Sequence, residues 1–265
     1  MKTQIFYSGS KGNCTYVSDG ETSILIDAGG CLKRIRENLA EVGDRLENVK
    51  GIFVTHEHSD HTKAIFNITK KYNCRIFTTV DTARAMCTPT ATLSVEDCRR
   101  VARSVMTIKP EKTYEIGTFQ IKPFSTPHDA ADSIGFILES VVSGKSLAYA
   151  TDIGHITKDM EGLFSGIKNV ILESNHDIEM LMNGPYPEYL KTRIISEVGH
   201  LSNEAAGKFL RLLAQHGVES VVLAHLSEEN NTPVLARESA RKALEGFDVK
   251  LEVASPYRRV EMKIC

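Results

Sequence analysis

No apolar run in this sequence approaches the ~20 residues that a membrane-spanning helix needs, so no transmembrane segment is expected. The first thirteen residues contain no apolar stretch followed by a small-residue cleavage site, and a secretory signal peptide is not expected either. Linkers, tandem repeats and low-complexity tracts are also missing. We therefore expect a cytoplasmic protein that folds as a single domain over residues 1–265.

The six cysteines contain no CxxC pair. Neither a disulfide framework nor a zinc knuckle is therefore expected. Most of these cysteines are typical of small apolar fillers in or near strands. Cys14 and Cys31 lie in or close to glycine-containing loops, so either could be sensitive to oxidation, but neither is predicted as a metal ligand.

An excess of charge of one sign is missing as well, since the formal net charge is −2. Binding of nucleic acid through a generally basic surface is therefore excluded, and any such binding must be local. Local clusters of basic residues would neutralise phosphates if the fold gathered them beside a cleft, although such clusters more often form a solvated face. The basic residues concerned are Arg99, Arg100, Arg103, Lys109, Lys112, Lys191, Arg193, Arg258 and Arg259.

With 42% hydrophobic residues in 265 positions, the chain can bury a large core. Its apolar runs alternate between strand-like and helix-like periods. The predicted strands are 3–7, 14–18, 22–27, 49–55, 75–78, 118–124, 134–141, 145–150, 169–172, 220–223 and 248–253, the last closing the chain. The predicted helices are 31–42, 61–72, 81–86, 177–183, 187–196, 203–215 and 233–243. This order favours two similar halves, with two packed sheets and helices outside them.

The strongest chemical signal is the segment THEHSDH at 55–61, which directly follows the apolar run 51–54. It places three histidines and two carboxylates in seven residues. Imidazole nitrogens and carboxylate oxygens are ligands for zinc, manganese and iron, and a short loop lets several of them converge. The alternative is a solvated polar turn, which is disfavoured because further metal-compatible residues occur in the same strand-end context. The sequence therefore predicts a metal centre.

Those further residues are Asp27 in ILIDAG, His128 in STPHD, Asp152 in AYATDIG and His225 in VVLAHLS. Together with the HxHxDH pattern of His56, His58, Asp60 and His61, this ordered series resembles the metallo-β-lactamase superfamily. The resemblance covers nearly the whole chain. It implies an α/β (α+β) fold of four layers, αββα, in which two mixed sheets are sandwiched between helices.

The resemblance also implies two divalent metal ions, which could be Zn, Mn or Fe. His56, His58 and His128 would hold the first ion, Asp60, His61 and His225 the second, and Asp152 would bridge them. Two such ions, about 3.5–4 Å apart, would bind a bridging hydroxide as the nucleophile and would clamp a phosphoryl oxygen. We also count Asp60 as a candidate catalytic residue. Asp27 would accept a hydrogen bond from a ligating imidazole; the alternative is a turn-capping role.

The pair Asp60 and His61 also occurs in glyoxalase II-like thioesterases, so the metal ligands alone do not decide the substrate class. Other segments of the chain bear on it. The segment EVGHLS at 197–202 resembles ribonuclease Z, in which a histidine upstream of the last ligand protonates the leaving oxygen. His200 is therefore the candidate general acid, and its ordinary pKa suits that task. The alternative is that His200 merely precedes the helix cap at Ser202 or Asn203.

The segments SGSKGN (8–13), LESNHD (172–177) and AHLSEENNTP (224–233) resemble YycJ/WalJ-type nucleases, which are related to ribonuclease Z. Backbone N–H groups in such loops can take an anion, although the glycines of 8–13 otherwise mark a tight turn. The candidate substrate-binding residues on this basis are Ser8, Asn13, Asn175, His176, Ser227 and Asn231.

The resemblance thus implies a dinuclear phosphodiesterase, most specifically a DNA exonuclease, whose partner is a nucleic acid. No inserted helical domain of the kind found in β-CASP nucleases lies between Asp152 and His225, which disfavours ribonuclease J-like enzymes. The segment 183–187 is too short for the arm with which ribonuclease Z holds tRNA, which disfavours tRNA processing. The alternative function is a small-molecule metallo-hydrolase acting on a thioester, lactone or cyclic phosphodiester. The native metal, the choice between DNA and RNA, the cleavage polarity and the oligomeric state stay open.

Overall fold

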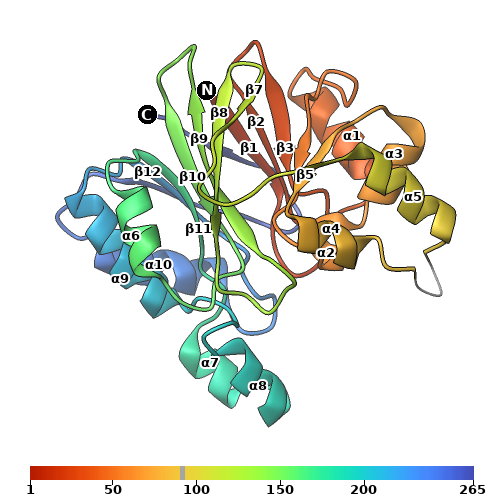
Figure 1. The fold of residues 1–265 in the computed structure, drawn as a ribbon. Coiled ribbons are helices and arrows are strands. Elements are labelled where there is room, and N and C mark those ends of the chain that lie inside the picture. The colour runs from red at the N-terminus through yellow and green to blue at the C-terminus, as the bar shows by residue number, and fades with distance from the viewer. Residues whose placement is uncertain (90–92) are drawn as a thin grey trace.

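A computed structural model of the chain describes residues 1–89 and 93–265. Its strands form two seven-stranded sheets that pack against each other (Figure 1). The first sheet runs in the order β14 (Val260–Met262), β1 (Lys2–Tyr7), β2 (Cys14–Ser18), β3 (Ser23–Ile26), β4 (Ile52–Phe53), β5 (Ile76–Thr78) and β6 (Val105–Thr107). The second runs in the order β13 (Lys250–Val253), β12 (Ser220–Ala224), β11 (Asn169–Glu173), β10 (Ser146–Ala150), β9 (Ile134–Ser140), β8 (Phe119–Ser125) and β7 (Tyr114–Ile116).

Helices cover the outer face of each sheet (Figure 1). Those of the first half are α1 (Leu32–Glu41), α2 (Ser59–Thr62), α3 (Ile65–Lys71), α4 (Val80–Met86) and α5 (Val95–Ser104). In the second half, α6 (Lys158–Phe164), α9 (Asn203–Gln215) and α10 (Pro233–Ala243) cover the sheet, whereas α7 (Ile178–Asn183) and α8 (Glu188–Ile194) project away from it (Figure 1). Within the described part of the chain, none of these helices has the length and apolar character needed to cross a membrane.

The two sheets repeat one pattern of strand pairing. In each, one half is antiparallel, whereas β3 to β6 in the first and β10 to β13 in the second are paired in parallel. The carboxyl ends of parallel neighbours meet at one edge of a sheet, where open α/β sheets bind their ligands. This repetition agrees with the predicted two similar halves.

The apolar core between the sheets is shared by both halves. Phe53 stacks on Phe77 with 4.7 Å between ring centroids. Phe53 also meets Phe136 of the second sheet edge to face, with centroids 5.6 Å apart. A second core lies between the first sheet and α1 and α3, and a third between the other sheet and α6, α9 and α10. The four-layer αββα fold with two mixed sheets is therefore confirmed, while the single domain over residues 1–265 stays a prediction.

The prediction of one continuous helix over residues 61–72 is wrong. The structure has two shorter helices, α2 and α3, because the carbonyl of His61 accepts from the backbone N–H of Ala28 at 2.8 Å instead of continuing a helix. The N–H of Ala64 in turn donates to the carbonyl of Ala28 at 2.8 Å. The backbone around the HxHxDH segment is thus fixed to the loop after β3.

The predicted last strand is also not the last. The chain continues to β14, which pairs antiparallel with β1 through Thr3 and Met262. The sequence analysis did not identify β14, nor the strands β6 and β7 or the helices α5 and α6. The second predicted hairpin is present as β9 and β10.

Candidate metal centre

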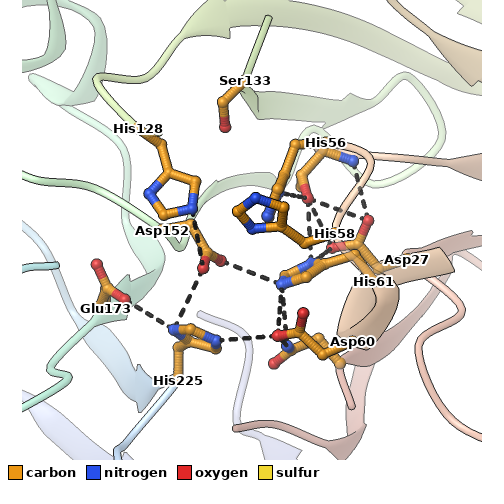
Figure 2. Close-up of polar contacts among 12 residues, drawn as sticks. Asp27, His56, His58, Asp60, His61, His128, Ser133, Asp152, Glu173 and His225 are labelled. Carbon is orange, nitrogen blue, oxygen red and sulfur yellow. Dashed lines mark hydrogen bonds and ion pairs between the residues drawn. The ribbon is translucent and has the colours of Figure 1, made fainter. Parts of the chain in front are cut away.

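The metal-compatible side chains come together at the carboxyl ends of strands from both sheets. Asp27 follows β3, Asp152 lies just beyond β10, and His225 follows β12 (Figure 2). These three residues have φ angles of 60°, 60° and 55°, in the left-handed region that non-glycine residues rarely adopt. Strain of this kind persists where the surrounding structure fixes it, and it collects at functional sites. The backbone therefore turns sharply at three strand ends, each bearing one of these side chains.

Among the described residues, four groups of side chains have ligand atoms that lie within 4.8 Å of one another inside each group. They are His56, His58 and His128; Asp60, His61 and His225; His56, His61 and Asp152; and Asp152, Glu173, His200 and His225. Asp152 lies between the first two groups, because its oxygens are 3.3 Å from His61 Nε2 and 3.8 Å from His128 Nε2. The structure thus brings together all seven of the residues predicted to hold metal.

Each of these imidazoles except His58 has its Nδ1 atom at a polar partner. Asp27 Oδ2 lies 2.8 Å from His61 Nδ1, and the carbonyl of Gly199 lies 3.1 Å from His128 Nδ1. His56 Nδ1 is 3.0 Å from the hydroxyl of Thr55. An acceptor at Nδ1 fixes the ring so that Nε2 is left for another partner, which is how metal-bound histidines are usually oriented.

The free atoms fit a cation. Among residues 1–89 and 93–265, no hydrogen-bond partner is found for the buried Nε2 atoms of His56, His128 and His225 or for Asp152 Oδ2. Leaving a buried polar atom without a partner is costly. His61 Nε2 is the exception, since the amide nitrogen of Asn13 lies 3.0 Å away. Unpartnered imidazole nitrogens that share a centre with carboxylates are a donor set suited to divalent metal.

The electrostatics lead to the same conclusion. Burial and the neighbouring histidines hold the pKa of His56 well below its ordinary value, so this imidazole is neutral and able to ligate. Burial lowers the pKa of His225, but Asp152, Asp60 and Glu173 outweigh it and raise it to about 10. Carboxylates of this density demand positive charge, which a divalent ion supplies.

Glu173 belongs to the site, although the sequence analysis did not select it. It is fully buried at the end of β11, and its Oε1 atom lies 2.8 Å from His225 Nδ1 and 2.9 Å from His200 Nδ1. Its Oε2 atom accepts from the backbone N–H groups of Ile153 and Leu201. A carboxylate closing an apolar strand, as in NVILE, is the signal that could have identified Glu173.

His200 lies beside the metal-compatible groups and lines a cavity of about 180 Å³. Its ring centroid is 5.1 Å from that of His128 and 5.2 Å from that of His225. The other lining residues are Ser10, His58, Asp60, His128, Asp129, Asp152, Leu190, Arg193, Ile194, Val198, Gly199 and His225. Ser202 caps α9 through its own hydroxyl, which accepts from the N–H of Ala205, so this cap does not need the His200 side chain.

Of the basic residues noted in the sequence, Arg193 lines this cavity, and its Nε atom is 2.9 Å from Asp129 Oδ2. The stretch from Arg99 to Lys112 contributes none of the lining residues. A larger open hollow of about 1160 Å³, lined by Tyr16, Asp19 and Asp44 among others, includes none of the predicted site residues. The chemistry therefore concentrates in the smaller cavity.

The six loop residues predicted to bind substrate are all buried. Asn13 lies at the metal-compatible groups, and its Oδ1 atom accepts from the Ser8 hydroxyl at 3.0 Å. The amide of Asn175 donates to the His225 carbonyl, and that of Asn231 donates to the Asn175 carbonyl. His176 and Ser227 are also buried, and burial lowers the pKa of His176 to about 4. Contact of these residues with substrate stays a prediction.

The two cysteines singled out in the sequence differ in environment. Cys14 is fully buried, and burial with the nearby Asp27 carboxylate raises the pKa of its thiol well above the ordinary range. A thiol in this state is a poor nucleophile, which argues against ready oxidation. Cys31 is exposed.

Comparison with known proteins identifies the family. Residues 22–226 match the model described as Beta-lactamase superfamily domain. The chain is 34% identical to exodeoxyribonuclease YycJ of Bacillus anthracis, over 92% of this chain and 90% of the relative. It is 31% identical to exodeoxyribonuclease WalJ of Streptococcus pneumoniae serotype 2 strain D39, over 97% of this chain and 95% of the relative.

A solved structure shows the same fold. The zinc-bound crystal structure of PqqB from Methylobacterium extorquens aligns with a TM-score of 0.71 at 16% sequence identity, over 98% of this chain and 99% of that one. Identity this low supports the fold alone. The family match and the two full-length relatives carry the assignment further. The chain therefore belongs to the β-lactamase superfamily, has the metallo-β-lactamase fold and is a metal-dependent hydrolase.

Proposed function

We propose that this protein is a dinuclear phosphodiesterase that removes nucleotides from an end of DNA, that is, an exodeoxyribonuclease. The observation that carries the proposal is His200, held by the buried carboxylate of Glu173 in a cavity beside seven converging metal-compatible residues. The similarity to two exodeoxyribonucleases over almost their whole length supports the choice of DNA.

The residues that would hold the metals are those of the first two groups above. His56, His58 and His128 would hold one ion, Asp60, His61 and His225 would hold the other, and Asp152 would be shared. The ions, when bound, supply an activated water at neutral pH and a Lewis acid for the phosphoryl oxygens. Asp27 lies at His61 Nδ1, which leaves His61 Nε2 as the nitrogen that would ligate.

His200 acts as the general acid in this proposal. The hydrogen bond from its Nδ1 atom to Glu173 leaves Nε2 as the ring nitrogen that can give a proton to the leaving 3′-oxygen. The charge of His200 holds the pKa of Glu173 well below its ordinary range despite burial, so Glu173 is an anion. A carboxylate acceptor at Nδ1 fixes the tautomer and orientation of the ring, as a positioned acid requires.

Arg193 supports a substrate with phosphate groups. Its guanidinium is held by Asp129, the residue after His128, and it is the only Lys or Arg among the described residues that line the cavity. Guanidinium groups bind phosphate oxygens with paired donors. We therefore assign Arg193 to a phosphate next to the one that is cleaved.

A second candidate function follows from the size of the cavity. At about 180 Å³ it is smaller than most ligand pockets, which favours either a single phosphodiester at a strand end or a small substrate such as a thioester, lactone or cyclic phosphodiester. The two possibilities differ in what must lie outside the cavity. DNA requires further binding surface, whereas a small ester does not.

The test uses protein stripped with chelator and reloaded with Zn or Mn. Labelled single-stranded DNA, duplex DNA, RNA, a thioester and a cyclic phosphodiester are incubated with wild type and with two variants. Asp60→Ala is expected to abolish cleavage, whereas His216→Ala, at an exposed histidine after α9, serves as the matched control. Stepwise release of nucleotides from one DNA end supports the proposal, and turnover of the thioester without any cleavage of DNA contradicts it.

A further inference from the structure

Three loops that carry the metal-compatible residues or touch them also meet at the surface. The loop 8–13 is tied to the centre, because the N–H of Asn13 donates to the Asp60 carbonyl at 2.7 Å. The hydroxyl of Ser8 accepts from the N–H of His225 at 2.9 Å, and the N–H of Ser8 donates to the carbonyl of Ser255 at 3.1 Å. The segments 225–231 and 255–259 are thereby fixed next to this loop.

Each of the three loops contributes one side chain to a cluster at this junction. Lys11 Nζ is 2.9 Å from Glu228 Oε2, and the hydroxyl of Tyr257 donates to the same oxygen. Lys11 Nζ also lies 6.0 Å from the centroid of the Tyr257 ring. Lys11 follows Ser10, which lines the metal cavity, and Glu228 follows His225 by three residues. Two members of the cluster are therefore close in the chain to residues that line the cavity.

The exposure of these side chains is unequal. The residue Tyr257 is 71% exposed. The side chain of Lys11 is 70% exposed, whereas the side chain of Glu228 is only 22% exposed. The largely buried carboxylate of Glu228 therefore holds the exposed ring of Tyr257 and the exposed ammonium group of Lys11 in place. Folding gains little from a ring left in water, and a ring that is already immobilised loses little entropy when it binds something.

We propose that Lys11, Glu228 and Tyr257 form a subsite for one nucleotide of a single-stranded nucleic acid. An unpaired base stacks on the Tyr257 ring, and Lys11 contacts the backbone phosphate of that nucleotide. An ammonium group has three donors, so Lys11 can bind a phosphate oxygen while it stays bonded to Glu228. The subsite takes a single strand because the faces of bases inside a duplex are covered by the stacked neighbouring pairs, whereas an unstacked base can present its face to the ring. This inference rests on the proposed nuclease function and adds where the strand lies.

The first test compares variants of the metal-loaded protein on a single-stranded oligonucleotide and on a small p-nitrophenyl phosphodiester. Tyr257→Ala is expected to lower kcat/KM for the oligonucleotide relative to the small ester by on the order of tenfold, mainly through KM, since one stacked base is lost. Tyr257→Phe keeps the ring and should retain most of this preference. Lys11→Met should weaken binding and reduce its salt dependence, unlike Lys33→Met, which removes a still more exposed lysine paired with Glu37 on α1.

The second test moves a single abasic spacer along the oligonucleotide. For wild type, the spacer should raise KM at one distance from the cleaved phosphate, and Tyr257→Ala should be insensitive to it at that distance. If Tyr257→Ala matches wild type on every substrate, or the spacer acts equally on both proteins, the subsite is wrong. A wild-type protein that cleaves no DNA would instead contradict the proposed function, so the two failures can be told apart.

Discussion

A single carboxylate oxygen of Glu173 serves two histidines with different proposed tasks. It lies 2.8 Å from His225 Nδ1 and 2.9 Å from His200 Nδ1, and all three residues come from different strand ends or loops of the second half. His225 is proposed to hold metal, and His200 to give a proton. Chemistry and metal binding are therefore coupled through one side chain, yet they can be separated by substitution.

His200→Ala is the substitution that isolates the proton transfer. It should lower kcat on DNA by roughly 10²–10⁴-fold, the usual contribution of a positioned acid, and leave both metals bound. The defect should shrink on a p-nitrophenyl phosphodiester, because that leaving group departs as an anion without a proton. Kinetics on both substrates and elemental analysis check this. Equal losses on the two substrates would exclude the acid role, and loss of one metal would make His200 a ligand.

Glu173→Gln should affect both tasks at once. The amide keeps the shape of the side chain but removes the carboxylate charge that holds the Nδ1 atoms of His200 and His225. We expect kcat and metal affinity each to fall by about 10–100-fold, the usual cost of losing such an outer partner. Chelator competition and steady-state rates measure the two effects. Glu219→Gln, at an exposed ion pair with Lys168, is the control, and a similar result for both variants would contradict the role of Glu173.

The sequence predicted the metal-compatible residues better than it predicted the contacts between residues that are far apart in the chain. His56, His58, Asp60 and His61 are close together in the chain, so their convergence follows from a short loop. The contact between Glu173 and His200 spans 27 residues. No local pattern could predict it, because it depends on β11 ending at the same sheet edge as β10 and β12. Asn175 and Asn231 are likewise found in a buried network that only the tertiary structure creates.

Among the secondary-structure elements, the loop after β3 leaves no space for a side chain at Gly29. A Cβ atom there would lie 1.4 Å from the Asp60 carbonyl oxygen. Gly162 in α6 is the opposite case, since a Cβ atom would meet nothing within 4 Å and the residue is exposed and helical. The same substitution should therefore have opposite signs at the two positions.

Gly29→Ala is expected to destabilise the fold by at least about 1–3 kcal/mol and to displace the metal loop, because the backbone must move. Gly162→Ala should stabilise it by about 0.5–1 kcal/mol through the higher helix propensity of alanine. Urea unfolding of the two variants, together with activity, measures both changes. A neutral Gly29→Ala would mean that the loops are not packed as closely as the structure has them.

The elements that the sequence analysis omitted are short or depend on their neighbours. β6 and β14 have three residues each and become strands only by pairing with β5 and β1. α5 did have a local signal, because Ser94 caps it and Asp97 follows three residues later. The break between α2 and α3 could not be predicted, because it arises from a backbone hydrogen bond between His61 and Ala28, which lies in the loop after β3.

For the molecule as a whole, the candidate metal centre joins the two sheets. His56, before α2, and His61, in α2, belong to the first half, whereas Asp152 and His225 belong to the second (Figure 2). The group of His56, His61 and Asp152 spans both halves, so an ion bound there would link them. In the metal-free protein the same place contains carboxylates and histidines packed at short distance.

Metal removal should therefore lower the thermal stability of the whole protein in one transition. A ligand that binds only the folded state stabilises it by about 2.7 kcal/mol when its concentration is 100 times its Kd. For a chain of this size each kcal/mol shifts the Tm by roughly 2–4 °C, so saturating metal should raise the Tm by roughly 5–10 °C per ion. Calorimetry with chelator and with added Zn or Mn, alongside elemental analysis, measures the shift and the expected two ions per chain.

The variants decide whether this shift comes from the proposed centre. Asp152→Asn, which changes the residue proposed to be shared by both ions, should abolish most of the metal-dependent rise in Tm, because it removes the charge between the two groups. His216→Ala should show the full rise, since that histidine lies at the end of α9 away from the cavity lining. A full rise in Asp152→Asn, or unfolding in two separate metal-dependent steps, would show that the ions do not hold the two sheets together.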